Sequence, residues 1–152
     1  MSKAEPSVTG VYRVCIAPDQ TIEKLLETGH YEFISPYMRE IHFPRADYQV
    51  SLDEVREIEL VYFGRDISTD EALRELDQRG LRPANVIELL AFGASYPDVQ
   101  RESPVVALGQ IFPYPHGSRN AVVLGILGEP RAVFLWLAND WYDGCRFLAV
   151  RR

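Results

Sequence analysis

Cysteine is scarce in this chain: only Cys15 and Cys145 occur among its 152 residues, near opposite ends. Neither has a partner at the spacing of a metal site. A bridge between them would require the N-terminal strand to lie beside the C-terminal hairpin, so we expect two free, buried thiols.

Long apolar segments are also missing. No run approaches the roughly twenty residues that a membrane-spanning helix needs, and the first ten residues, MSKAEPSVTG, contain no apolar core of a secretory signal. We therefore expect no membrane span and a protein made in the cytoplasm, with a virion or surface display as the alternative.

Neither a basic stripe nor a metal-binding pattern is visible. The net charge of −6 and the pI near 5.1 oppose binding to phosphate backbones, so no nucleic-acid partner is expected. His30 and His42 have no further ligands at fixed spacing, which favours structural histidines and no bound metal.

Catalytic motifs are absent too. The chain has no nucleophile motif, phosphate-binding glycine loop or dinucleotide fingerprint, so we expect no cofactor and no enzyme activity. Asp140 and Asp143 share a loop and would be the candidate acid–base pair, but neighbouring loop acids are usually solvated. Only Arg146 would lower the pKa of the Cys145 thiol.

The residues that are present predict one α+β domain over residues 1–152. Hydrophobic residues make up 47% and charged residues 25% of the chain, which is ordinary for a globular protein. Alternating or apolar runs predict strands, and a Thr21 cap predicts one short early helix. The strands are expected at Val11–Ile16, Glu40–Phe43, Val55–Phe63, Val105–Leu108, Ala121–Leu127, Val133–Leu137 and Arg146–Val150, and the early helix at Ile22–Glu27.

Two further helices carry clear end signals. Ser68 and Glu71 form a capping box, and Gly80 supplies the left-handed residue that ends the helix. Asn85 and Glu88 form a second cap pair, and Gly93 is expected to end that helix.

The terminal stretch Ala132–Arg151 predicts two apolar strands joined by an insert over residues 138–144. Trp141 and Tyr142 place large rings among small turn formers there, a composition typical of recognition loops. The alternative is a hydrophobic hairpin whose tryptophans close a small core.

The order of these features resembles a known family. A capped helix, the link Gly80–Pro83, a second helix with ELLAFG, the strand VVALG, and an end segment with Trp136, Asp140-Trp141 and RFLAVR follow one another. This order, over Val55–Arg152, resembles the C-type lectin-fold variable proteins of diversity-generating retroelements of bacteria, archaea and their viruses. The resemblance implies two short helices packed on small antiparallel sheets and a loop-rich C-terminal half, with residues 1–54 as the less certain N-terminal part.

In that family, adenine-directed mutagenesis changes positions near the carboxyl end that form a ligand-binding face. The resemblance implies that residues 104–152 carry such a region, with Trp136, Arg146, Phe147 and Val150 as scaffold. Asparagine, tyrosine, aspartate, glycine, cysteine, leucine, alanine and valine are all reachable when adenines of an asparagine codon are replaced, so the loop composition permits this interpretation. The candidate ligand-binding residues are Arg119, Asn120, Glu129, Arg131, Leu135, Leu137, Ala138, Asn139, Asp140, Tyr142, Asp143, Gly144 and Cys145.

Two departures from related proteins narrow the function. Sugar-binding C-type lectins hold calcium with Glu-Pro-Asn and Trp-Asn-Asp segments, whereas this chain has Glu129-Pro130-Arg131, and a cationic Arg131 cannot be an oxygen ligand. Formylglycine-generating enzymes share the fold but use neighbouring thiols in their active site. Because Cys145 has no nearby thiol in the sequence, we expect no such oxidase chemistry.

The sequence thus predicts a receptor-like protein that binds an unknown protein or cell-surface ligand. Loop aromatic and aliphatic side chains would supply affinity, with Arg131, Asp140 and Asp143 orienting the partner at the rim. The alternatives are an enzyme or enzyme accessory on a formylglycine-generating-enzyme-like scaffold and a structural virion or assembly component.

Overall fold

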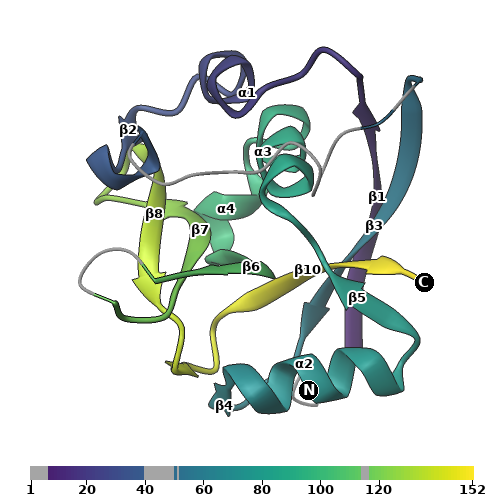
Figure 1. Ribbon diagram of the computed structural model, residues 1–152. Coiled ribbons are helices and arrows are strands. Elements are labelled where there is room, and N and C mark those ends of the chain that lie inside the picture. The colour runs from purple at the N-terminus through teal and green to yellow at the C-terminus, as the bar shows by residue number, and fades with distance from the viewer. Residues whose placement is uncertain (1–6, 40–49, 51, 114–116) are drawn as a thin grey trace.

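The computed structural model describes residues 7–39, 50, 52–113 and 117–152, and within them the protein is α+β (Figure 1). This class was predicted. The expected strand at Glu40–Phe43, which contains His42, lies outside the described residues.

The strands are β1 (Ser7–Ile16), β2 (Phe33–Ile34), β3 (Glu54–Tyr62), β4 (Ile67–Ser68), β5 (Leu81–Pro83), β6 (Val105–Phe112), β7 (Asn120–Ile126), β8 (Arg131–Leu137), β9 (Asp140–Trp141) and β10 (Arg146–Arg151). The helices are α1 (Ile22–Thr28), α2 (Thr69–Gln78), α3 (Val86–Ser95) and α4 (Val99–Glu102), with a 3₁₀ turn, η1, at Pro36–Arg39.

One eight-stranded mixed sheet dominates, in the order β1-β3-β10-β6-β7-β8-β2, with β5 also paired to β10. β10 runs parallel to β6, and β2 runs parallel to β8. The small antiparallel sheets expected from the resemblance are therefore replaced by this sheet plus the two-stranded pair β4-β9.

The predicted terminal hairpin is wrong as well, because β8 and β10 are separated by β7 and β6. The reason is burial of β10 on both faces. Phe147 and Ala149 pack into one core, and Leu148 and Val150 into another. A strand that is apolar on both sides is stable only in the middle of a covered sheet.

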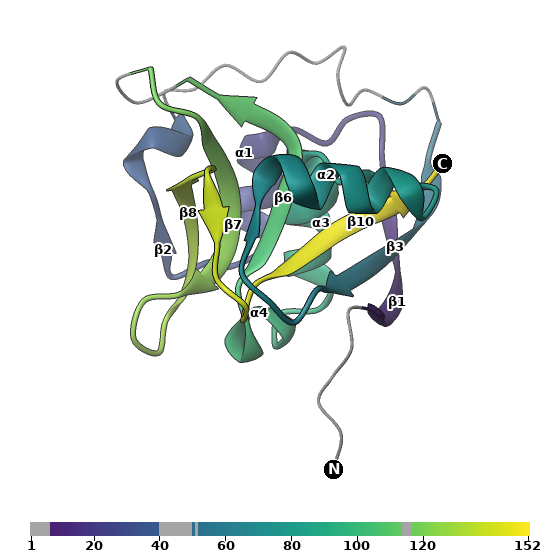
Figure 2. The same cartoon turned by 90° about the horizontal axis from the view of Figure 1, so that it is seen from below.

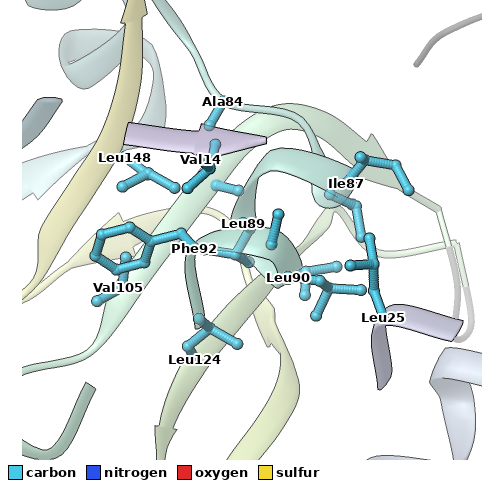
Figure 3. Close-up of a cluster of buried hydrophobic side chains, with 14 of the residues drawn as sticks. Val14, Leu25, Ala84, Ile87, Leu89, Leu90, Phe92, Val105, Leu124 and Leu148 are labelled. Atoms are coloured by element: carbon cyan, nitrogen blue, oxygen red, sulfur yellow. The ribbon is translucent and has the colours of Figure 1, made fainter. Parts of the chain in front are cut away.

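The two cores lie on opposite sides of the sheet. We call the side that carries α1 and α3 the α3 face, and the opposite side the α2 face (Figures 1 and 2). In the α3-face core, Phe92 and Leu89 of α3 are surrounded by side chains from β1, β6, β7 and β10 (Figure 3). On the other face, Leu76 of α2 packs with Phe63 and Phe147.

The helix starts follow the predicted capping chemistry. Ser68 Oγ accepts a hydrogen bond from the Glu71 amide at 3.1 Å, and Glu71 Oε1 accepts one from the Ser68 amide at 3.0 Å. Asn85 and Glu88 form the same reciprocal pair at α3. Gly80 has φ of +75°, as expected for the residue after α2.

Gly93 does not end α3, which continues to Ser95. Its role is close packing: a Cβ at Gly93 would lie 2.1 Å from the Tyr31 hydroxyl oxygen. The position therefore requires glycine because a side chain from a neighbouring segment occupies the space, not because the backbone turns.

Arg131 was predicted at the ligand rim, but it is buried and structural. Its guanidinium donates to the Gly29 carbonyl at 2.7 Å, to the Gly93 carbonyl at 2.8 Å and to Gln100 Oε1 at 3.1 Å, and it lies 4.7 Å from the centre of the Tyr31 ring. These bonds satisfy carbonyls of α1 and α3 that would otherwise be buried without donors, and they fasten both helices to β8.

Both cysteines are free thiols, as predicted, but only Cys145 is buried and Cys15 is exposed. Among the described residues, no helix combines the length and apolarity needed to cross a bilayer.

Candidate functional site

The α2 face of the sheet is covered unevenly. α2 packs against β4 and β5 beside β10, away from β8 and β2 in both views of the fold (Figures 1 and 2). At the β8–β2 end, Phe33, Phe134 and Trp136 are half-buried and Tyr142 is exposed. We call these four residues the aromatic face.

Strand alternation places the rings of β8 on this side. Val133 and Leu135 point into the α3-face core, so Phe134 and Trp136 point the other way. The Phe134 and Trp136 rings stack with centroids 5.7 Å apart. Phe33, brought alongside by the parallel pairing of β2 with β8, lies 5.9 Å from Phe134.

Thr69, the first residue of α2, holds the loop that follows β8. Its amide donates to the Asn139 carbonyl at 2.9 Å, and its hydroxyl donates to the Ala138 carbonyl at 2.6 Å and accepts from Trp141 Nε1 at 2.9 Å. The short β4-β9 ladder adds backbone pairing between Ile67 and Trp141. The loop is therefore attached to the scaffold through both side-chain and backbone bonds.

The sequence left two readings for Trp141, a ring of a recognition loop or a ring that closes a small core, and its 3% exposure supports the second. Its ring meets Phe147 edge-on at 6.0 Å, and its indole nitrogen is bonded to Thr69. Trp141 anchors the loop, and the next residue, Tyr142, is the one presented to solvent, with 52% of its surface exposed.

Gly144 allows the position of the Tyr142 ring. The Cys145 amide closes a tight turn by donating to the Tyr142 carbonyl at 3.1 Å. A Cβ at Gly144 would lie 2.7 Å from Tyr142 Cε2, so any larger residue forces the ring to move.

A cleft of about 270 Å³ lies between the loop, β7, β8 and the end of α4. Trp136 and Tyr142 contribute rings, and α4 and the residues after it contribute polar groups. Its lining residues are Gln100, Arg101, Glu102, Ser103, Pro104, Gly125, Ile126, Trp136 and Tyr142.

The two charged side chains that line the cleft differ in whether they already have partners. Arg101 donates to the Glu129 carbonyl at 2.7 Å and pairs with Glu32 and Asp98 at 3.6 and 3.9 Å. Glu102 is exposed and has no ion pair within the part of the chain that the structure describes. Burial raises the pKa of the Tyr142 hydroxyl, and the nearby Cys145 and Asp143 raise it further.

Most of the candidate ligand-binding residues are at the surface, although four are not. Leu137 and Tyr142 are 54% and 52% exposed. Those that are exposed or half-buried are Arg119, Glu129, Leu135, Leu137, Asn139, Asp140, Tyr142, Asp143 and Gly144. Those that are buried, and so cannot contact a partner directly, are Asn120, Arg131, Ala138 and Cys145.

Each of the remaining buried positions has a structural reason. Ala138 lies against α2 because its carbonyl accepts the Thr69 hydroxyl, and the Asn120 amide group donates to the Ser118 carbonyl at 2.9 Å beside the paired end of β8. Cys145 packs in the α2-face core. Burial raises the pKa of the Cys145 thiol to about 11, so the thiol stays protonated at neutral pH.

The candidate residues do not all share one surface. Leu135 lies on the α3 face, and alternation places Leu137 on the same side, opposite Trp136. Arg119 pairs with Asp70 at 3.6 Å at the start of α2. Only the Tyr142 loop, which includes Asp143 and Gly144, adjoins the cleft.

Sequence reasoning missed the rings that complete the site. The family resemblance implies a scaffold role for Trp136, and the candidate ligand-binding residues do not include Phe134 or Phe33. The alternation of Val133, Leu135 and Leu137 with Phe134 and Trp136 was the available signal, because it separates the two faces of β8. No sequence signal places Phe33 or the end of α4 beside them.

The described residues contain no group of three or more histidine, cysteine or acidic side chains arranged to hold a metal ion. Comparisons of this chain with protein-family models, with curated proteins and with solved structures find no match.

Proposed function

We propose that this protein binds a macromolecular ligand, a protein or cell-surface molecule, through the aromatic face and the adjoining loop 138–145. The observation that carries the proposal is the pairing of an open row of aromatic rings with a cleft and with a loop fastened to the scaffold by Thr69.

The energetics favour binding at this place. Half-exposed aromatic rings bury large apolar areas when a partner covers them, and Trp and Tyr dominate the affinity of protein interfaces. Because Phe134 and Trp136 are already stacked and Tyr142 rests on Gly144, little side-chain freedom is lost on binding.

We further propose that the chain has a C-type lectin-like fold and is a variable protein of a diversity-generating retroelement. The support is the order of motifs over Val55–Arg152 and the exposure of loop positions such as Asn139 and Tyr142, where side chains can be exchanged at little cost in stability. Sequencing the surrounding locus tests this proposal. A neighbouring reverse transcriptase and a near-repeat of the terminal codons that differs at adenines are expected, and a locus with neither contradicts it.

Binding itself is tested by selecting clones from a random peptide display library on the immobilised full chain. Selected clones are expected to lose binding to the double variant Trp136→Ala, Tyr142→Ala and to keep it for Leu137→Ala. Leu137 is a matched control because its exposure is close to that of Tyr142 but it lies on the other face of β8. Clones that bind the double variant and the natural chain equally contradict the proposed site.

A further inference from the structure

We propose that the cleft beside the aromatic face receives a cationic side chain, arginine or lysine, from a basic polypeptide segment of the partner. This inference rests on the proposed function and names the chemistry of its ligand.

The size of the cleft suits one side chain. Its volume of about 270 Å³ is below the ~300–1,000 Å³ typical of pockets for small molecules and cofactors. The backbone of Gly125 forms part of the lining, and a Cβ there would lie 3.3 Å from the Phe134 ring. The cleft therefore continues directly from the stacked rings, and a side chain entering it would bring its own backbone over the aromatic face.

The walls suit a cation. Trp136 and Tyr142 both line the cleft, and the faces of such rings carry negative electrostatic potential that attracts guanidinium and ammonium groups. The same attraction already operates in this fold where Arg131 lies 4.7 Å from the Tyr31 ring centre.

The charge balance at the cleft is negative. The positive charge of Arg101 is neutralised by Glu32 and Asp98. Glu102 lines the cleft without a cationic partner within the described residues. Asp143 does not line the cleft, but it is exposed and directly follows the lining residue Tyr142. Arg146 Nη1 donates a hydrogen bond to Ser103 Oγ at 2.8 Å, but the guanidinium carbon lies 5.2 Å from the centre of the Tyr62 ring. Tyr62 of β3 is the strand partner of Arg146 in β10, and both side chains lie on the α3 face. An entering cation would thus meet the uncompensated carboxylate of Glu102, with the carboxylate of Asp143 on the adjoining loop.

The experiment is an NMR titration of the full chain with N-acetylarginine amide and, as a matched probe, N-acetylcitrulline amide, which has nearly the same shape but no charge. The indole N–H signal of Trp136, assigned with Trp136→Phe, reports on the cleft, and that of Trp141, buried and bonded to Thr69, serves as the internal reference. We expect a saturable shift of the Trp136 signal with the arginine probe and about tenfold weaker binding of citrulline.

Charge variants sharpen the result. Glu102→Gln and Asp143→Asn are each expected to weaken arginine binding about threefold. Glu23→Gln removes the same charge from an exposed site on α1 and is expected to change nothing. Gly144→Ala moves the Tyr142 ring and is expected to weaken binding without a change of charge.

Equal binding of arginine and citrulline, or equal effects of Glu102→Gln and Glu23→Gln, overturns the inference. The display selection separates this failure from that of the proposed function. Clones that depend on Trp136 and Tyr142 but are not enriched in basic residues leave the binding face standing and reject the cationic ligand. A selection that yields no such clones rejects both.

Discussion

The two ends of the main sheet obey the same strand alternation but differ in what covers them. In β3, β10 and β6, alternate side chains point to opposite faces of the sheet, and both sets are buried, one under α3 and the other under α2. At β8 and β2, Val133 of the α3 face is buried, but Ile34 and Leu135 on that face are half-buried and Leu137 is exposed. On the α2 face of the same strands, Phe33, Phe134 and Trp136 are half-buried. The comparison teaches that an apolar residue in this protein is core or surface according to which helix reaches it, because hydrophobicity is similar at both ends.

The largest effect on stability is expected from a cavity created at the covered end of the sheet. Leu148→Ala removes a fully buried side chain between α3 and the centre of β10, and we expect a loss of roughly 2–5 kcal/mol in the free energy of unfolding. Leu137→Ala, at an exposed position on β8, is expected to cost less than about 0.5 kcal/mol. Urea unfolding of both variants measures the difference, and similar costs would contradict the contrast between the two ends.

The buried carboxylate of Glu88 is the second difference, since the aromatic face contains no such group. Glu88 is fully buried and bonded to Arg82 at 2.7 and 3.0 Å, to Arg56 at 2.7 Å, and to the Asn85 amide. Burial alone would raise the pKa of Glu88, but these bonds outweigh it and hold the pKa below its usual value.

A group whose pKa is lowered by folding stabilises the protein above its unfolded pKa, and the benefit is lost as the pH falls through the folded value. We therefore expect the natural chain to lose stability below about pH 4.3. Glu88→Gln should cost roughly 2–3 kcal/mol at pH 7, less than a fully enclosed pair because Arg56 and Arg82 are partly exposed. Its unfolding free energy should also vary less with pH. Identical pH profiles of the two proteins would exclude the ion pair as the cause.

The smallest effect is expected at Thr69, the residue that joins α2 to the loop following β8. Thr69→Val leaves the Ala138 carbonyl and the Trp141 indole N–H without their partner, which should cost about 1–2 kcal/mol. Amide exchange over residues 139–145 is expected to accelerate more than exchange in α3. Thr28→Val is the control, because its hydroxyl donates to the Lys24 carbonyl at an exposed position. Unchanged exchange in the loop would mean that Thr69 does not hold it.

The local features were predictable because each depends on residues close in sequence. The cap pairs Ser68–Glu71 and Asn85–Glu88 and the left-handed Gly80 follow from three- or four-residue patterns and are all present. The positions of the longer strands were predictable to within a few residues for the same reason, since alternation is a local property. The short strands β2, β4, β5 and β9 were not predicted.

The sequence by itself determined the α+β class, the helix caps and the set of apolar strands. Only the tertiary structure decided that β10 lies between β3 and β6. It also decided that Trp141 is buried and anchors the loop, whereas Tyr142 is exposed to solvent, and that Arg131 donates hydrogen bonds to the carbonyls of Gly29 and Gly93. Those outcomes depend on partners tens of residues away, such as Thr69 and Trp141, whose sequence separation is 72. No local pattern encodes them, because strand pairing and burial are settled by which distant surfaces fit together.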